Sequence, residues 1–100
     1  GGAAFMTDDF ETIRNYHERA VFDAVAERAE HFPHLRTQGL MADIACVALN
    51  RLPPRYIRHG VDFAFYLSEK ERQETQAAVE EAVEFAVGFV QARAAMRARR

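Results

Sequence analysis

The chain has 100 residues, of which 49% are apolar and 28% are charged, and its formal net charge is −2. This composition is typical of one soluble globular domain, and the mild acidity gives no general attraction to nucleic acids or membranes. One cysteine excludes an internal disulfide, and no apolar run reaches the roughly 18–20 residues of a membrane span. With no visible signal peptide, we expect a cytoplasmic protein whose single domain covers residues 6–100, after a cloning remnant at residues 1–5.

The first predicted helix runs from Thr7 or Asp8 to His31. Thr7 can cap the first turn, acidic residues follow it at the positive end of the helix dipole, and Pro33 ends the helix. The spacing of three and four residues predicts one apolar stripe, which contains Phe10, Ile13, Tyr16 or His17, Ala20, Val21, Ala24 and Val25.

The second predicted helix begins at Thr37 or Leu40 and ends at Arg51. It is apolar nearly all round, which indicates burial on most sides, in part against a second copy of the chain. Cys46 lies in this helix, and we interpret it as a packed core thiol rather than as a nucleophile. No P-loop, nucleophile elbow or dinucleotide glycine fingerprint occurs, so we expect no enzymatic activity.

Residues 52–67 are the ambiguous part of the chain. Apolar residues at alternate positions favour an extended segment, followed by a short helical turn at residues 63–67. The last helix begins clearly, because Ser68 followed by Glu71 forms a capping box, and it continues to Met96 or Ala98. Its apolar stripe is flanked by Phe85 and Phe89, and Gly88 in mid-helix suggests the close approach of another helix.

These elements predict an all-α fold: a small helical domain with three main helices and a short extended or irregular Pro-Pro segment. The last helix is nearly thirty residues long, which is more than a small monomer needs. We therefore expect a homodimer. The arginines that follow Arg93 complement the negative end of this helix, and we expect no nucleic-acid binding by them.

The prolines that follow the second helix hold several arginines on a stiff turn. Pro53 and Pro54 cannot continue a helix, and Leu52 is kept extended because it precedes a proline. Arg51, Arg55 and Arg58, with Tyr56, suit the binding of a phosphate or a flat base. Asp43 or Asp62 could accept hydrogen bonds from the N1–H and N2–H groups of a guanine.

Other interpretations of the turn stay open. Arg51 can neutralise the end of its helix, Asp43 can satisfy backbone groups, and Tyr56 with Ile57 can belong to the core. The prolines can then simply set an angle between elements. The turn could also dock the carboxylates of a partner protein.

The run from Asp43 to Arg72, DIACVALNRLPPRYIRHGVDFAFYLSEKER, resembles the signature of the late competence protein ComFB family. Asn15-Tyr16 is similar to the first element of that signature, residues 43–56 to its core, and residues 68–98 to its final long helix. Many members carry several cysteines just before the core aspartate and are described as zinc-binding. Residues 31–42 contain no cysteine here, so we expect no metal, and we interpret His31 and His34 as solvated loop residues.

Some members of the family that the chain resembles act as cyclic-dinucleotide receptors. The resemblance implies a non-enzymatic receptor, with cyclic-di-GMP as a regulatory ligand rather than a cofactor and an unidentified regulatory protein as partner. We prefer the guanine nucleotide because a chain rich in Ala and Arg, with a single Lys, indicates a GC-rich genome. The alternative is a ligand-free helical adaptor that binds a protein through residues 63–66, in competence, pilus or motility regulation.

Overall fold

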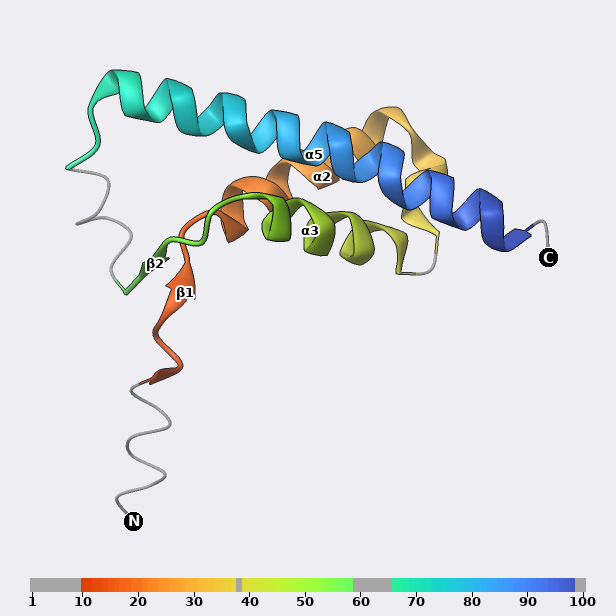
Figure 1. Ribbon diagram of the computed structural model, residues 1–100, viewed down its shortest axis with the longest axis horizontal. Coiled ribbons are helices and arrows are strands. Elements are labelled where there is room, and N and C mark those ends of the chain that lie inside the picture. Colours follow the sequence, from red (N-terminus) through yellow and green to blue (C-terminus); the bar gives the residue numbers. More distant parts are fainter. Residues whose placement is uncertain (1–9, 38, 59–65, 99–100) are drawn as a thin grey trace, which may run out of the picture.

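The computed structural model describes residues 10–37, 39–58 and 66–98. Three helices dominate it: α2 (Glu18–His31), α3 (Leu40–Arg51) and α5 (Glu69–Ala98), with a 3₁₀ turn, η1 (Pro33–Arg36), between the first two. Figure 1 shows α5 lying along the molecule, with α2 and α3 packed on one side of it. The prediction of an all-α fold is confirmed.

A two-stranded antiparallel ribbon stands at one end of the helices. It joins β1 (Arg14–Asn15) to β2 (Tyr56–Ile57), with Arg14 opposite Ile57 and Asn15 opposite Tyr56 (Figure 1). The ribbon confirms that the segment after the prolines is extended, whereas the predicted helical turn at residues 63–67 falls mostly outside the described residues.

The core fills the space where the three helices meet. Each helix contributes side chains at spacings of three and four residues, so that one stripe of every helix faces inward. Leu35 in η1 is fully buried and closes this core at the turn between α2 and α3. The largest fully buried side chains are Val21, Leu35, Ile44, Val79 and Val83.

The predicted start of the first helix is wrong. The helix begins at Glu18 rather than at residue 7 or 8, and Arg14 and Asn15 form a strand instead. Phe10 and Ile13 precede the helix and are exposed, so they do not belong to its apolar stripe. The physical reason lies at Asn15, whose side chain and neighbours form a helix cap of their own.

The hydrogen bonds of Asn15 have the arrangement of a capping box placed just before the helix, whose own N-cap residue, His17, makes no side-chain capping bond. The Asn15 Oδ1 atom accepts a hydrogen bond from the backbone N–H of His17 at 3.1 Å. In return, a carboxylate oxygen of Glu18 accepts one from the backbone N–H of Asn15 at 3.2 Å. These bonds satisfy donors at the start of a helix, so the chain turns into α2 here.

The bounds predicted for α3 are confirmed. Ile44, Ala45 and Ala48 are buried, whereas Cys46, predicted to be a packed core thiol, is exposed in the single chain. The predicted burial of the rest of this helix against a second copy of the chain stays a prediction. Gly39 precedes this helix with a φ of 72°, a backbone conformation that a glycine adopts without steric cost.

The predicted capping residue of α5 is confirmed. Ser68 Oγ accepts a hydrogen bond from the backbone N–H of Glu71 at 3.1 Å and donates one to the Glu71 carboxylate at 3.2 Å. The predicted inner stripe is buried, and Phe85 and Phe89 flank it with their rings stacked at 5.9 Å. Within the described residues, a Cβ atom added at Gly88 would meet nothing within 4 Å, so this chain itself brings no helix close to that glycine.

Candidate functional site

The proline turn begins where α3 ends. Leu52 leaves the helix with φ −85° and ψ 141°, while its backbone N–H still donates to the Ala48 carbonyl at 3.3 Å. Its side chain is buried and anchors the turn in the core. Because the two prolines fix their own φ angles, the chain leaves this anchor in an extended direction toward β2.

Two separate parts of the sequence signature meet in the ribbon. The backbone N–H of Tyr16 donates to the Arg55 carbonyl at 2.6 Å, and Asn15 Oδ1 accepts from the backbone N–H of Arg55 at 3.4 Å. The Asn15-Tyr16 pair thus holds the backbone of the turn in place. One side chain, Asn15, caps α2 and positions Arg55 at the same time.

His17 is buried beside this junction. It is only 7% exposed, and its ring lies edge-on to that of Tyr16. Its Nδ1 atom has no hydrogen-bond partner among the residues that the structure describes. Burial lowers the pKa of His17 below its ordinary value of 6.5, and the positive charge of Arg55 lowers it further. A hydrogen bond to the backbone of Pro53 acts in the opposite direction. The turn therefore rests on a histidine that favours its neutral form.

Arg51 points away from the turn and onto α5. Its Nε and Nη2 atoms donate to the Glu81 carboxylate at 3.2 and 2.7 Å, and its guanidinium lies 4.0 Å from the centre of the Phe85 ring. The hydrogen bonds with Glu81 raise the pKa of Arg51 and lower the pKa of the glutamate. Arg51 thus joins α3 to α5, instead of only neutralising the end of its own helix.

Arg55, Tyr56 and Arg58 remain on the exposed ribbon. Tyr56 is 69% exposed, so it is not a core residue, whereas Ile57 is half-buried. Successive side chains of an extended strand point to opposite faces, so the exposed Tyr56 and the half-buried Ile57 of β2 project from opposite faces of the ribbon. Arg55, Tyr56 and Arg58 are neighbours along the chain, and they line neither the cavity between α2 and α5 nor the one between α3 and α5.

Asp43 lies apart from the other predicted site residues. It sits in the first turn of α3, about 12 Å along the helix axis from Arg51. There it lines a small cavity of about 260 Å³ between α3 and the last part of α5, together with Arg93 and Arg97. The structure therefore does not bring Asp43 to the arginine turn, and Asp62 falls outside the described residues.

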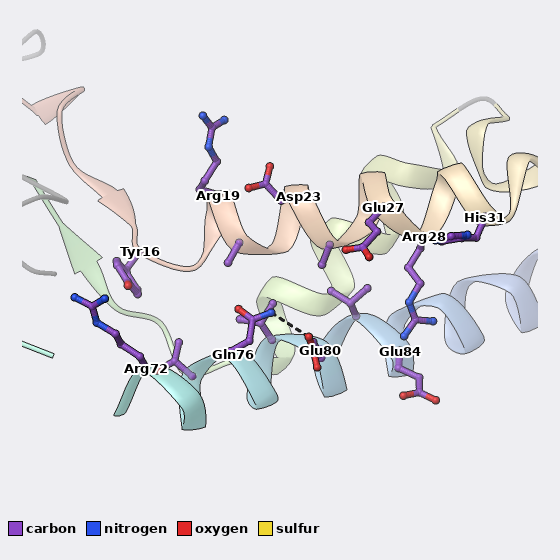
Figure 2. A pocket seen from close by; sticks show the side chains of 15 residues that line it. Tyr16, Arg19, Asp23, Glu27, Arg28, His31, Arg72, Gln76, Glu80 and Glu84 are labelled. Atoms are coloured by element: carbon purple, nitrogen blue, oxygen red, sulfur yellow. Dashed lines mark hydrogen bonds between the residues drawn. The ribbon is translucent and has the colours of Figure 1, made fainter. Parts of the chain in front are cut away.

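A larger groove, of about 710 Å³, runs between α2 and α5. Figure 2 shows Tyr16 and Arg72 at the end of the groove nearest the ribbon, and Gln76 and Glu80 further along α5. Gln76 Nε2 donates to Glu80 Oε1 at 3.1 Å. The apolar lining of the groove consists of the partly exposed Ala20 and Ala24 and the fully buried Val79 and Val83.

The motifs of the sequence do not indicate this groove. Its polar residues recur every four positions along α5, at Arg72, Gln76, Glu80 and Glu84, beside the apolar stripe. That spacing is the signal that could have placed them on one edge of the helix. The groove itself depends on how α2 packs against α5, which the spacing along one helix does not determine.

Two classes of site have no support within the described residues. No group of three or more His, Cys, Asp or Glu side chains there is arranged to hold a metal ion. Of the two histidines considered as ligands, His31 is exposed and His34 lies 2.8 Å from Gln91 through its Nε2 atom. Nor does any helix in this part of the chain combine the length and apolar character needed to cross a membrane.

Comparison with known proteins identifies the family. The family model described as late competence development protein ComFB matches residues 14–94. No curated protein and no solved structure matches the sequence. The matched region contains the Asn15-Tyr16 pair, the proline turn, α2, α3 and nearly all of α5. The chain therefore belongs to the late competence development protein ComFB family.

Proposed function

We propose that this protein is a cytoplasmic, non-enzymatic receptor for cyclic-di-GMP, and that the proline turn carries its ligand contacts. Membership of the ComFB family indicates a small competence-related protein, and that family is not known as a family of enzymes. The proposal concerns the ligand and the residues that bind it: Arg55, Tyr56 and Arg58 directly, with Arg51 and Asp43 in secondary roles.

The exposure of Tyr56 is the observation that carries the proposal. A tyrosine ring that is 69% exposed gains nothing from the core, yet its backbone is held firmly by pairing with Asn15. An aromatic ring on a rigid support stacks on a nucleobase at low entropic cost. Arg55 and Arg58 flank it with the guanidinium groups that bind phosphate oxygens or the O6 and N7 atoms of guanine.

Arg51 and Asp43 contribute less directly to this proposal. The guanidinium of Arg51 already donates to Glu81, so a ligand would have to compete for it. Asp43 faces a different cavity. We expect substitution of either residue to change affinity less than substitution of Arg55 and Arg58 does.

Isothermal titration calorimetry with cyclic-di-GMP tests the proposal. The wild-type protein should bind saturably, and the double variant Arg55→Ala/Arg58→Ala should lose at least about tenfold in affinity, since hydrogen bonds to charged groups contribute roughly 1.5–3 kcal/mol each. The matched control is Arg36→Ala/Arg97→Ala, which removes the same charge at two exposed positions away from the turn. Equal losses in both double variants would show non-specific attraction and contradict a site at the turn.

A second candidate function is that of a ligand-free adaptor. Tyr66 is 84% exposed, the highest value among the large apolar and aromatic side chains of the described residues, and it ends the aromatic segment 63–66. An exposed aromatic of this kind suits the centre of a protein interface. Folded wild-type protein that gives no heat with cyclic-di-GMP or cyclic-di-AMP would favour the adaptor over the receptor.

The proposal includes a homodimer, because a twofold-symmetric ligand matches a twofold-symmetric receptor. The exposed face of α5 around Gly88 is the surface that supports this assembly. Phe85 and Phe89, at 41% and 42% exposure, lie on either side of the glycine on that face.

A further inference from the structure

We propose that the groove between α2 and α5 receives a guanine base, and that Gln76 and Glu80 recognise its Watson–Crick edge. This inference rests on the proposed function and deepens it, because it names the base and the residues that select it. It also replaces the role that the sequence suggested for Asp43, which lies in another cavity.

The groove begins at the proline turn. Tyr16 lines its end, and the backbone N–H of the same residue donates to the Arg55 carbonyl at 2.6 Å. Arg72 stands beside Tyr16 in Figure 2, and Arg19 also lines the groove. The positive charges at this end suit the phosphates of a nucleotide whose other contacts are on the turn.

The floor of the groove suits the flat face of a base. Ala20 and Ala24 are partly exposed and provide the accessible apolar surface between the two helices, while Val79 and Val83, which also line the groove, are fully buried in the core. The groove volume of about 710 Å³ falls within the range of roughly 300–1,000 Å³ typical of small-molecule sites. A base that lies on this floor would present its edge to the polar side chains of α5.

The hydrogen bond between Gln76 and Glu80 sets the pattern that such a base would meet. Gln76 uses one amide hydrogen for Glu80 Oε1, which leaves its second amide hydrogen and the remaining carboxylate lone pairs of Glu80 for a ligand. Guanine offers one acceptor, O6, beside two donors, N1–H and N2–H. The Gln76 amide can donate to O6, and the carboxylate can accept from both donors.

Adenine fits the same pair poorly. It presents a single donor, the N6 amino group, beside an acceptor at N1. The lone pair of adenine N1 would face the negative carboxylate of Glu80. No hydrogen bond could form between these two acceptors. The groove therefore selects guanine by its donors, and each well-formed pair of this kind is worth about five- to 100-fold in discrimination.

Acidic side chains also fix the direction in which the nucleotide enters. Glu27 on α2 and Glu84 on α5 line the groove beyond Glu80 together with Arg28, as Figure 2 shows, so the carboxylates outnumber the guanidinium there. Their negative charge disfavours a phosphate in this part of the groove. The phosphates consequently stay at the Tyr16 and Arg72 end. Gln76 lies about 6 Å and Glu80 about 12 Å further along the helix axis, a distance comparable with the reach of one nucleotide.

The test compares cyclic-di-GMP with cyclic-di-AMP by isothermal titration calorimetry, using the wild-type protein, Glu80→Gln and the control Glu74→Gln. Glu80→Gln keeps the size of the side chain but replaces one acceptor oxygen by an NH2 group. This group is a donor, so it cannot accept a hydrogen bond from guanine N1–H or N2–H. Glu74 lies on the same helix, outside the groove, and forms a long ion pair of 3.9 Å with Lys70. Circular dichroism verifies that each variant keeps its helical content.

We expect wild-type protein to prefer cyclic-di-GMP, Glu80→Gln to lose about tenfold or more of that preference, and Glu74→Gln to retain it. Cyclic-di-GMP binding that is unchanged in Glu80→Gln would overturn the base site while leaving the receptor function intact. An equal loss for both nucleotides would also overturn it, because Glu80 would then not distinguish the bases. If neither nucleotide binds the wild-type protein, the proposed function itself fails, and this inference fails with it.

Discussion

His17 couples the proline turn to pH. In the folded protein its pKa lies below the ordinary value of 6.5, because burial and the charge of Arg55 both disfavour the protonated ring. The unfolded chain therefore binds more protons than the folded one at pH values below about 6.5. Stability contributed by neutral His17 is fully present above the unfolded pKa and is lost as the pH falls through 6.5 toward the folded pKa.

We accordingly predict that the free energy of unfolding in urea decreases between pH 7 and pH 5. A single proton limits the part due to His17 to a slope of about 1.4 kcal/mol per pH unit. The variant His17→Phe should show a smaller slope, whereas His31→Gln, which removes an exposed histidine from the other end of α2, should keep the wild-type slope. The same slope in the wild-type protein and in His17→Phe would contradict this role.

The individual residues of the candidate site were only partly predictable from sequence. The prolines dictate an extended turn wherever they occur, so the stiffness of residues 53–55 follows from residue type alone. The partners of that turn do not. Asn15 lies 40 positions before Arg55, and Glu81 lies 30 positions after Arg51, so both contacts depend on the tertiary packing of the helices.

Cys46 shows a related limit. An apolar helix indicates burial, but the composition of one helix does not say how many neighbours cover it. Here Cys46 is exposed and lines the small cavity between α3 and the last part of α5, so it is not packed in the core of the single chain.

At the scale of elements, the start of α2 is set by its cap. Thr7 with the acids that follow it, and Asn15 with Glu18, are both sequence patterns of a helix start. The second pattern forms a helix cap in the structure, because Asn15 also pairs in the ribbon and accepts a hydrogen bond from Arg55. The periodicity of apolar residues alone predicts a start of α2 that is too early. The end of α2 before Pro33 and both ends of α3 were predictable from glycine, proline and charge signals.

We predict that Asn15→Ala lowers the free energy of unfolding by about 1 kcal/mol, the usual cost of losing such a cap. Asn15→Asp keeps an acceptor oxygen at the same position and should restore most of the stability. Urea denaturation followed by circular dichroism gives both values. If the alanine variant is as stable as the wild-type protein, the bonds of Asn15 to His17 and Arg55 do not stabilise the start of α2.

At the scale of the whole molecule, α5 presents an apolar face that is only partly covered, with the guanidinium groups of Arg51 and Arg93 lying 4.0 and 5.9 Å from the centres of the Phe85 and Phe89 rings. Phe85, Gly88, Phe89, Ala92 and Met96 recur at three- and four-residue spacings, so they form one stripe on the outside of the helix. Phe85 and Phe89 are about two-fifths exposed, and Met96 is 68% exposed. A second copy of α5 laid across Gly88 would bury this stripe, and the missing side chain of the glycine would let the two helices approach closely.

Gly88→Leu separates the behaviour of a monomer from that of such a dimer. Within one chain, a side chain added at position 88 meets open space. Leucine is also a far better helix former than glycine, so the substitution should stabilise a monomer by up to about 1 kcal/mol. In a dimer packed through this stripe, the same side chain would hold the helices apart. We therefore predict that Gly88→Leu shifts the protein from dimer to monomer in sedimentation velocity, while Gln73→Leu, on an exposed position near the start of α5, leaves the dimer intact. A wild-type protein that sediments as a monomer at every concentration, or a Gly88→Leu variant that dimerises as before, would show that this face does not pair.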